Sequence, residues 1–174
     1  MPNIELKLTL SSNRNQSGIL TIIDQSTNQV LGQFEALGRG SQGGGDTQMQ
    51  VNGNTPTGTY NVTRLVDTNA WNQNSYGPNG ALRLSPTSGN SLAAEQQIGR
   101  QGLLVHGGSP GGNNYWRGAD ELRATHGCVR LSNENMENLV GILFEATLDE
   151  RNQQSSNIDI NLTVTDHNMS FARP

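Results

Sequence analysis

The chain has 174 residues, a length typical of one domain that buries a hydrophobic core without disulfides or metals. Only 32% of the residues are hydrophobic and 15% are charged, and the remainder is rich in Gly, Asn, Gln, Ser and Thr, which favour turns and short strands. The net charge is -4, and the 11 Lys and Arg residues are scattered. The sequence therefore shows no basic patch for nucleic acid, and we expect one domain over residues 1–174.

The chain contains no apolar stretch approaching the roughly eighteen residues that a transmembrane helix requires, so we expect no membrane span. Residues 1–7 lack a basic segment followed by an apolar run, so we also expect no signal peptide.

Alternating apolar and polar residues predict a strand near each end of the chain, at 4–10 and 158–164, and these two strands are candidates to pair with each other. Two short apolar runs at 19–23 and 30–34 are separated by polar turn-forming residues and predict a hairpin. The Gly-, Gln- and Asn-rich segment 38–54 has no periodicity and predicts a long flexible loop. A turn at Thr55-Pro56-Thr57-Gly58 and further strands are expected at 59–66, 81–84 and 102–106.

One helix is predicted to begin near Ser132 or Asn133, either of which can cap it. Its apolar face is formed by residues spaced three and four apart, namely Met136, Leu139, Val140, Leu143 and Phe144. We therefore predict a mainly β fold, a sandwich or partly closed barrel of mixed sheets with one principal helix.

Cys128 is the single cysteine, so it has no partner within the chain for a disulfide. A lone cysteine is most often a small buried hydrophobe. A nucleophilic thiol, whose usual pKa is about 8.5, needs a basic or cationic neighbour or a lowered pKa. His106, His126 and Arg130 are candidates for that neighbour. Gly127 would let a substrate carbonyl approach backbone N–H groups that stabilise an oxyanion.

These residues resemble the catalytic motif of the L,D-transpeptidase (YkuD-type) family, which has a His-Gly at a strand end and then Ser/Thr-x-Gly-Cys, an apolar residue and Arg or Asn. The matching segments are His106-Gly107 and Thr125-His126-Gly127-Cys128-Val129-Arg130. The segment 55–60 is similar to the Thr-Pro-x-Gly-x-aromatic stretch that precedes the histidine in this family. The resemblance covers about residues 18–144 and implies an L,D-transpeptidase-like fold.

The resemblance implies that Cys128 is the nucleophile, His106 the general base, and the carbonyl of Gly107 the group that orients the imidazole. His126 would be auxiliary, and Thr125 would donate a hydrogen bond to the loop or substrate. Arg130 would hold a substrate carboxylate, brace the loop or form a structural ion pair.

The segment between His106 and Cys128 is longer than is usual in the family and contains Tyr115 and Trp116 among glycines. These aromatic side chains would form a lid or platform over the peptide stem, or would pin the loop to the core.

The activity implied by the resemblance is attack on a peptidoglycan tetrapeptide stem, followed by transfer of the acyl group to an amine, which makes a 3–3 crosslink without any cofactor. The competing hypotheses are hydrolysis of the same acyl-enzyme by an L,D-carboxypeptidase, a non-catalytic cell-wall-binding β module, and a metal site built from the same His and Cys residues. The substrate would place the protein in the periplasm or cell wall. Because we expect no signal peptide at this N-terminus, either the protein is exported by another route or its sequence was trimmed.

Overall fold

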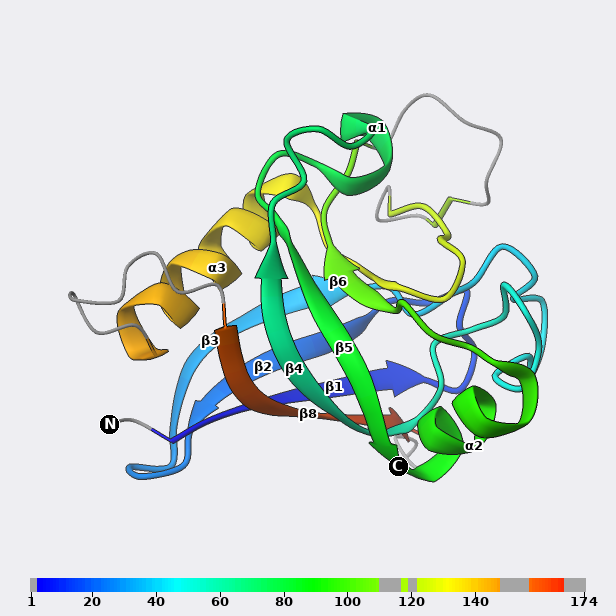
Figure 1. Ribbon diagram of the computed structural model, residues 1–174, viewed down its shortest axis with the longest axis horizontal. Helices are drawn as coiled ribbons and strands as arrows, with labels where there is room; N and C mark the ends of the chain where they lie inside the picture. Colours follow the sequence, from blue (N-terminus) through cyan, green and yellow to red (C-terminus); the bar gives the residue numbers. More distant parts are fainter. Residues whose placement is uncertain (1–2, 110–116, 119–121, 148–156, 168–174) are drawn as a thin grey trace, which may run out of the picture.

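The computed structural model describes residues 3–109, 117–118, 122–147 and 157–167 (Figure 1). Its eight strands form one mixed sheet, in the order β3-β2-β1-β8-β4-β5-β6-β7. The strands are β1 (Ile4–Ser11), β2 (Gly18–Asp24), β3 (Gln29–Ala36), β4 (Gly58–Val66), β5 (Ala81–Ser88), β6 (Leu104–His106), β7 (Val129–Arg130) and β8 (Asn157–His167).

The first and last strands of the described chain, which the sequence left as candidates to pair, do pair. β8 lies between β1, to which it is parallel, and β4, to which it is antiparallel. β2 and β3 form the predicted antiparallel hairpin. β5 continues beyond the predicted 81–84 to Ser88, whereas β6 begins only at Leu104.

The two edges of the sheet meet, so the sheet is nearly closed into a barrel. Leu37, directly after β3, exchanges two backbone hydrogen bonds with Arg130 of β7, each 2.9 Å long. This single bridge joins the first strand in the sheet order to the last. The prediction of a mainly β, partly closed barrel with mixed strand directions is confirmed.

The barrel interior is filled by the apolar side of each alternating strand. Leu6 and Leu8 of β1 and Leu162 of β8 are fully buried, while their polar neighbours in β1 point outward. Because buried and outward-facing positions alternate, apolar and polar residues alternate in the sequence, and this pattern predicted the strands.

α3 (Asn133–Thr147) is the principal helix and packs against the sheet near β3 (Figure 1). The Ser132 hydroxyl caps it by accepting a 3.1 Å hydrogen bond from the Asn135 N–H. Met136 and Leu139 are fully buried, as predicted. Phe144 was expected on the same face but is 38% exposed, because it lies on the rim of that face, beyond the edge of the core.

Two shorter helices were not predicted. α1 (Gln73–Tyr76) has only four residues, and α2 (Gly89–Ile98) buries only Ser91 and Ala94. Because α2 has no apolar face, its sequence carries no helical periodicity.

The described part of segment 38–54 forms a loop, as expected, but many of its residues are buried. Thr47, Gln48 and Asn54 are less than a tenth exposed. The Asn54 side-chain amide accepts a hydrogen bond from the Gly40 N–H and donates one to the Gly45 carbonyl. No helix among the described residues is both long and apolar enough to span a bilayer.

We predict that Leu162→Ala in the central strand β8 lowers the free energy of unfolding by about 2–5 kcal/mol, because it leaves a cavity in the core. The matched control Thr165→Ala, at an exposed position of the same strand, should change it by less than about 0.5 kcal/mol. Urea unfolding measures both values, and equal losses would show that β8 does not form the centre of the core.

Candidate active site

The parallel pairing of β6 with β7 decides which side chains face the same way. Val105 lies opposite Val129, and His106 lies opposite Arg130. Side chains alternate along a strand, so Val105 and Val129 point together into the core, where both are fully buried. Residues 104, 106, 128 and 130 point to the other face, where all four line one cavity. The register therefore brings His106 and Cys128 to the same surface.

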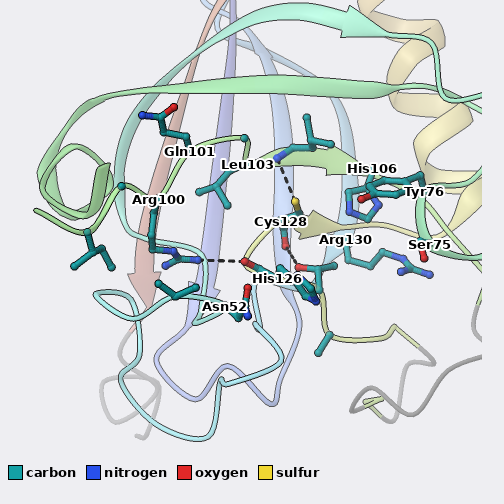
Figure 2. Close-up of a pocket in the computed structure, with 17 residues that line it drawn as sticks. Asn52, Ser75, Tyr76, Arg100, Gln101, Leu103, His106, His126, Cys128 and Arg130 are labelled. Carbon is teal, nitrogen blue, oxygen red and sulfur yellow. Dashed lines mark hydrogen bonds between the residues drawn. The ribbon is translucent and has the colours of Figure 1, made fainter. Parts of the chain in front are cut away.

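The cavity has a volume of about 420 Å³. Its walls come from residues 51–52 of the long loop, Ser75 and Tyr76 of α1, the segment from the end of α2 into β6, and the segment 124–130. In the view of Figure 2, Cys128 lies between Arg100 on one side and His106 on the other.

The His106 imidazole is oriented by its own neighbour in sequence. Its Nδ1 lies 2.6 Å from the Gly107 carbonyl oxygen. Because a carbonyl oxygen only accepts, Nδ1 carries the proton and Nε2 keeps a lone pair. The Tyr76 ring packs on the imidazole with centroids 5.0 Å apart. Burial, together with the positive charge of Arg130, lowers the pKa of His106 to about 4, and the Gly107 hydrogen bond opposes this shift only in part.

Cys128 forms no disulfide, and the residue as a whole is partly buried. Its sulfur accepts a 3.3 Å hydrogen bond from the Leu104 N–H, across the β6–β7 pairing. Desolvation raises the pKa of Cys128 to about 11, and the Leu104 N–H and the charge of Arg100 only partly oppose that rise.

Burial thus favours the neutral form of both the thiol and the imidazole. A raised thiol pKa disfavours the first route to a reactive cysteine, a thiolate present at neutral pH. The second route is open, because a neutral imidazole with a lone pair on Nε2 can take the proton as the sulfur attacks.

Two threonines fix the loop that carries the cysteine. The Thr125 hydroxyl accepts a hydrogen bond from the Gly127 N–H at 3.0 Å and donates one to the Cys128 carbonyl at 2.9 Å. The Thr55 hydroxyl donates to the Gly127 carbonyl at 2.7 Å. Thr125 therefore acts on the loop, one of its two expected contacts, and the Thr-Pro-Thr-Gly segment touches the cysteine loop directly.

These bonds also decide which N–H groups remain for an oxyanion. The Gly127 N–H is already bound to Thr125. Within the described part of the chain, the Cys128 N–H makes no hydrogen bond. It is therefore a backbone donor at this loop that remains available to an oxyanion.

Position 127 has to be glycine because neighbouring atoms of the same chain leave no room for a side chain. Its φ is +111°, and an added Cβ would lie 2.0 Å from Nη2 of Arg100 and 2.9 Å from the Gly53 carbonyl oxygen. The place of a side chain at this position is taken by Arg100. The expected approach of a substrate carbonyl to the backbone at Gly127 stays a prediction.

Arg130 is 3% exposed and lines the cavity. Its Nη2 donates to the Ser109 carbonyl at 2.9 Å, and its Nε has no partner. Desolvation, followed by repulsion from Arg123, lowers the pKa of Arg130 to about 10. Among the described residues it pairs with no carboxylate, so of its expected roles the ion pair is not observed there.

Of the remaining predicted site residues, one lies at the cavity and two fall outside the described part of the chain. His126 is exposed and lines the cavity. Tyr115 and Trp116 lie outside the described residues, so the lid stays a prediction.

Sequence reasoning missed Arg100 and Tyr76, because both reach the site from elements far from the His and Cys motifs. The described residues also contain no group of three or more His, Cys, Asp or Glu side chains arranged to hold a metal ion.

Known proteins were compared with this chain in both fold and sequence. The structure of Bd1075 from Bdellovibrio bacteriovorus is similar in fold, with a TM-score of 0.56 and 13% identity. The alignment covers 94% of this chain and 48% of Bd1075, so the chain spans about half the length of that protein. No curated protein matches. The family model of the L,D-transpeptidase catalytic domain (YkuD) matches residues 18–147, three quarters of the sequence and including every motif described above, and the chain belongs to this family.

Proposed function

We propose that the protein is a peptidoglycan L,D-transpeptidase that forms an acyl-enzyme on Cys128 and passes the acyl group to an amine. The observation that supports this most directly is the shared wall of β6 and β7. There a thiol and an imidazole with a lone pair on Nε2 line one cavity. Membership of the family supplies the substrate class, peptidoglycan stem peptides.

In the first step, Nε2 of His106 takes the thiol proton while the sulfur of Cys128 attacks the carbonyl at the L-centre of the third stem residue. The Cys128 N–H binds the oxyanion. Collapse of this intermediate breaks the amide bond, and the imidazolium returns its proton to the amine of the departing D-alanine. A thioester is left on Cys128.

In the second step, the side-chain amine of the third residue on a neighbouring stem attacks the thioester, with His106 again taking the proton. The product is a 3–3 crosslink and free Cys128. Water attacking the same thioester would give the L,D-carboxypeptidase reaction. Both reactions belong to the periplasm or cell wall, where the substrate is.

Arg130 is proposed to bind the terminal carboxylate of the stem. It lines the cavity and its guanidinium is a buried positive charge that pairs with no carboxylate among the described residues. Guanidinium–carboxylate pairs are among the stronger hydrogen-bonded pairs in proteins, so a carboxylate that enters the cavity would find a matching charge.

We predict that Cys128→Ala abolishes conversion of purified muropeptides while the domain stays folded, because alanine removes only the sulfur. Mass spectrometry separates the outcomes for the wild type, since crosslinked dimers indicate transpeptidation and tripeptides alone indicate hydrolysis. Turnover by Cys128→Ala above the level without enzyme would contradict the proposal. Wild type that converts no muropeptide and acylates with no stem peptide would favour the binding module.

His106→Ala should lower kcat/KM by about 10²–10⁴-fold, the usual contribution of a general base. His126→Ala is the matched control at the exposed side of the cavity and should change it far less. Equal losses in the two variants would mean that His106 is not the base.

The neutral pair predicts a characteristic pH dependence. Because the folded pKa of His106 lies near 4, below its usual value, His106 remains a base in mild acid, and kcat/KM should fall only as the pH drops through about 4. Thiolate ultraviolet absorbance, taken as wild type minus Cys128→Ala, should be absent at neutral pH and appear as the pH rises towards 11. Thiolate absorbance at neutral pH would instead indicate a preformed ion pair.

A further inference from the structure

Arg100 enters the site from the end of α2. Gly99 ends this helix in the left-handed conformation, and the Arg100 N–H binds back to the Ala94 carbonyl. This turn points the Arg100 side chain inward, and the residue is only 6% exposed.

The guanidinium of Arg100 is held by backbone carbonyls. Nη1 donates to the carbonyls of Gln48 at 2.7 Å and Asn54 at 2.8 Å. Nη2 donates to the carbonyls of Gly53 at 3.0 Å and His126 at 3.4 Å. One side chain therefore ties the long loop to the cysteine loop.

These partners are dipoles without net charge. No carboxylate among the described residues neutralises Arg100, and desolvation lowers its pKa. A buried cation with only neutral partners stabilises any anion that forms beside it. The ionisable groups whose negative charge acts on Arg100 are Tyr60 and Cys128. Burial raises the pKa of Tyr60 well above its usual value, which leaves Cys128 as the group that ionises during a reaction.

The geometry brings that charge against the cysteine loop. Nη2 occupies the place of a side chain on Gly127, the residue before Cys128. Arg100 and Cys128 line the same cavity, and Figure 2 shows the guanidinium on the side of Cys128 away from His106. The sulfur thus has a proton acceptor on one side and a fixed positive charge on the other.

We propose that Arg100 is a positioning residue that provides the counter-charge for the Cys128 thiolate as His106 removes its proton. The proton passes from the sulfur to Nε2, the sulfur keeps the electron pair for attack on the carbonyl, and Arg100 stays protonated throughout. The same side chain holds the His126 carbonyl, so charge and loop geometry come from one residue. This inference rests on the proposed role of Cys128 as nucleophile.

The test measures the thiol without substrate, so it remains valid even if stem peptides are not the substrate. At a fixed pH below the thiol pKa, the rate of alkylation by iodoacetamide is proportional to the thiolate fraction. Arg100→Gln removes the charge and should lower this rate about tenfold or more, which corresponds to a rise of about one unit in the pKa of Cys128. Arg100→Lys keeps the charge and should stay within about threefold of the wild type.

The matched control is Arg39→Gln. Arg39 is also buried in the loop layer, but its guanidinium binds Asn15 and the Gly40 carbonyl. This variant loses a buried guanidinium away from the sulfur, so it should lower stability and leave the alkylation rate unchanged. If Arg100→Gln does not fold, Arg100→His replaces it, because imidazole is neutral at an alkaline pH of measurement.

A purely structural role would destabilise all three Arg100 variants to urea and leave the pH dependence of alkylation in the folded protein unchanged, and this result would overturn the proposal. An equal slowing in Arg100→Lys and Arg100→Gln would overturn it as well. Failure of muropeptide turnover with the expected alkylation rates would reject the proposed substrate and leave the counter-charge role intact.

Discussion

The parallel register between β6 and β7 is the constraint on which the active site depends. It sets His106 opposite Arg130 and puts Cys128 on the cavity face, while Val105 and Val129 fill the core. Strands of three and two residues are too short to hold a register alone. The backbone bonds of Arg130 to Leu37 and of Leu131 to His106 hold it. A slip by one residue would turn the cysteine toward the core. The same backbone bonds therefore close the barrel and keep Cys128 on the cavity face.

Burial also sets the chemistry of the pair. The same low-dielectric surroundings raise the pKa of the Cys128 thiol and lower that of the His106 imidazole, because each charged form loses hydration. Proton transfer between them is therefore unfavourable before substrate binds. In the proposed mechanism, the Cys128 N–H and the Arg100 guanidinium would act on charges that exist only during the reaction, so their stabilisation would fall on the transition state.

Buried arginines give the Gly-rich loops their structure. Arg14 pairs with Asp166 at 2.8 Å and also donates to the Thr55 carbonyl at 3.1 Å. Arg39, Arg100 and Arg130 likewise donate to backbone carbonyls. A guanidinium has five donors in a fixed plane, so one side chain can satisfy carbonyls from several loop segments that lack a ladder partner. Two of these arginines, Arg100 and Arg130, also line the cavity and place positive charge in its wall.

The sequence by itself determined the elements whose signals are local. Period-two alternation marked β1 and β8, the turn residues marked the β2–β3 hairpin, and an apolar stripe after two candidate caps, Ser132 and Asn133, marked α3. The His-Gly and Thr-His-Gly-Cys segments likewise indicated the candidate pair of His106 and Cys128, because a motif is short and contiguous. Only the tertiary structure decided that Arg100 takes the place of a side chain on Gly127, that Tyr76 packs on His106, and that burial raises the pKa of Cys128 and lowers that of His106. Those features arise from contacts between segments distant in the chain and from the loss of water around each group. Neither cause produces a local pattern in the sequence from which it could be predicted.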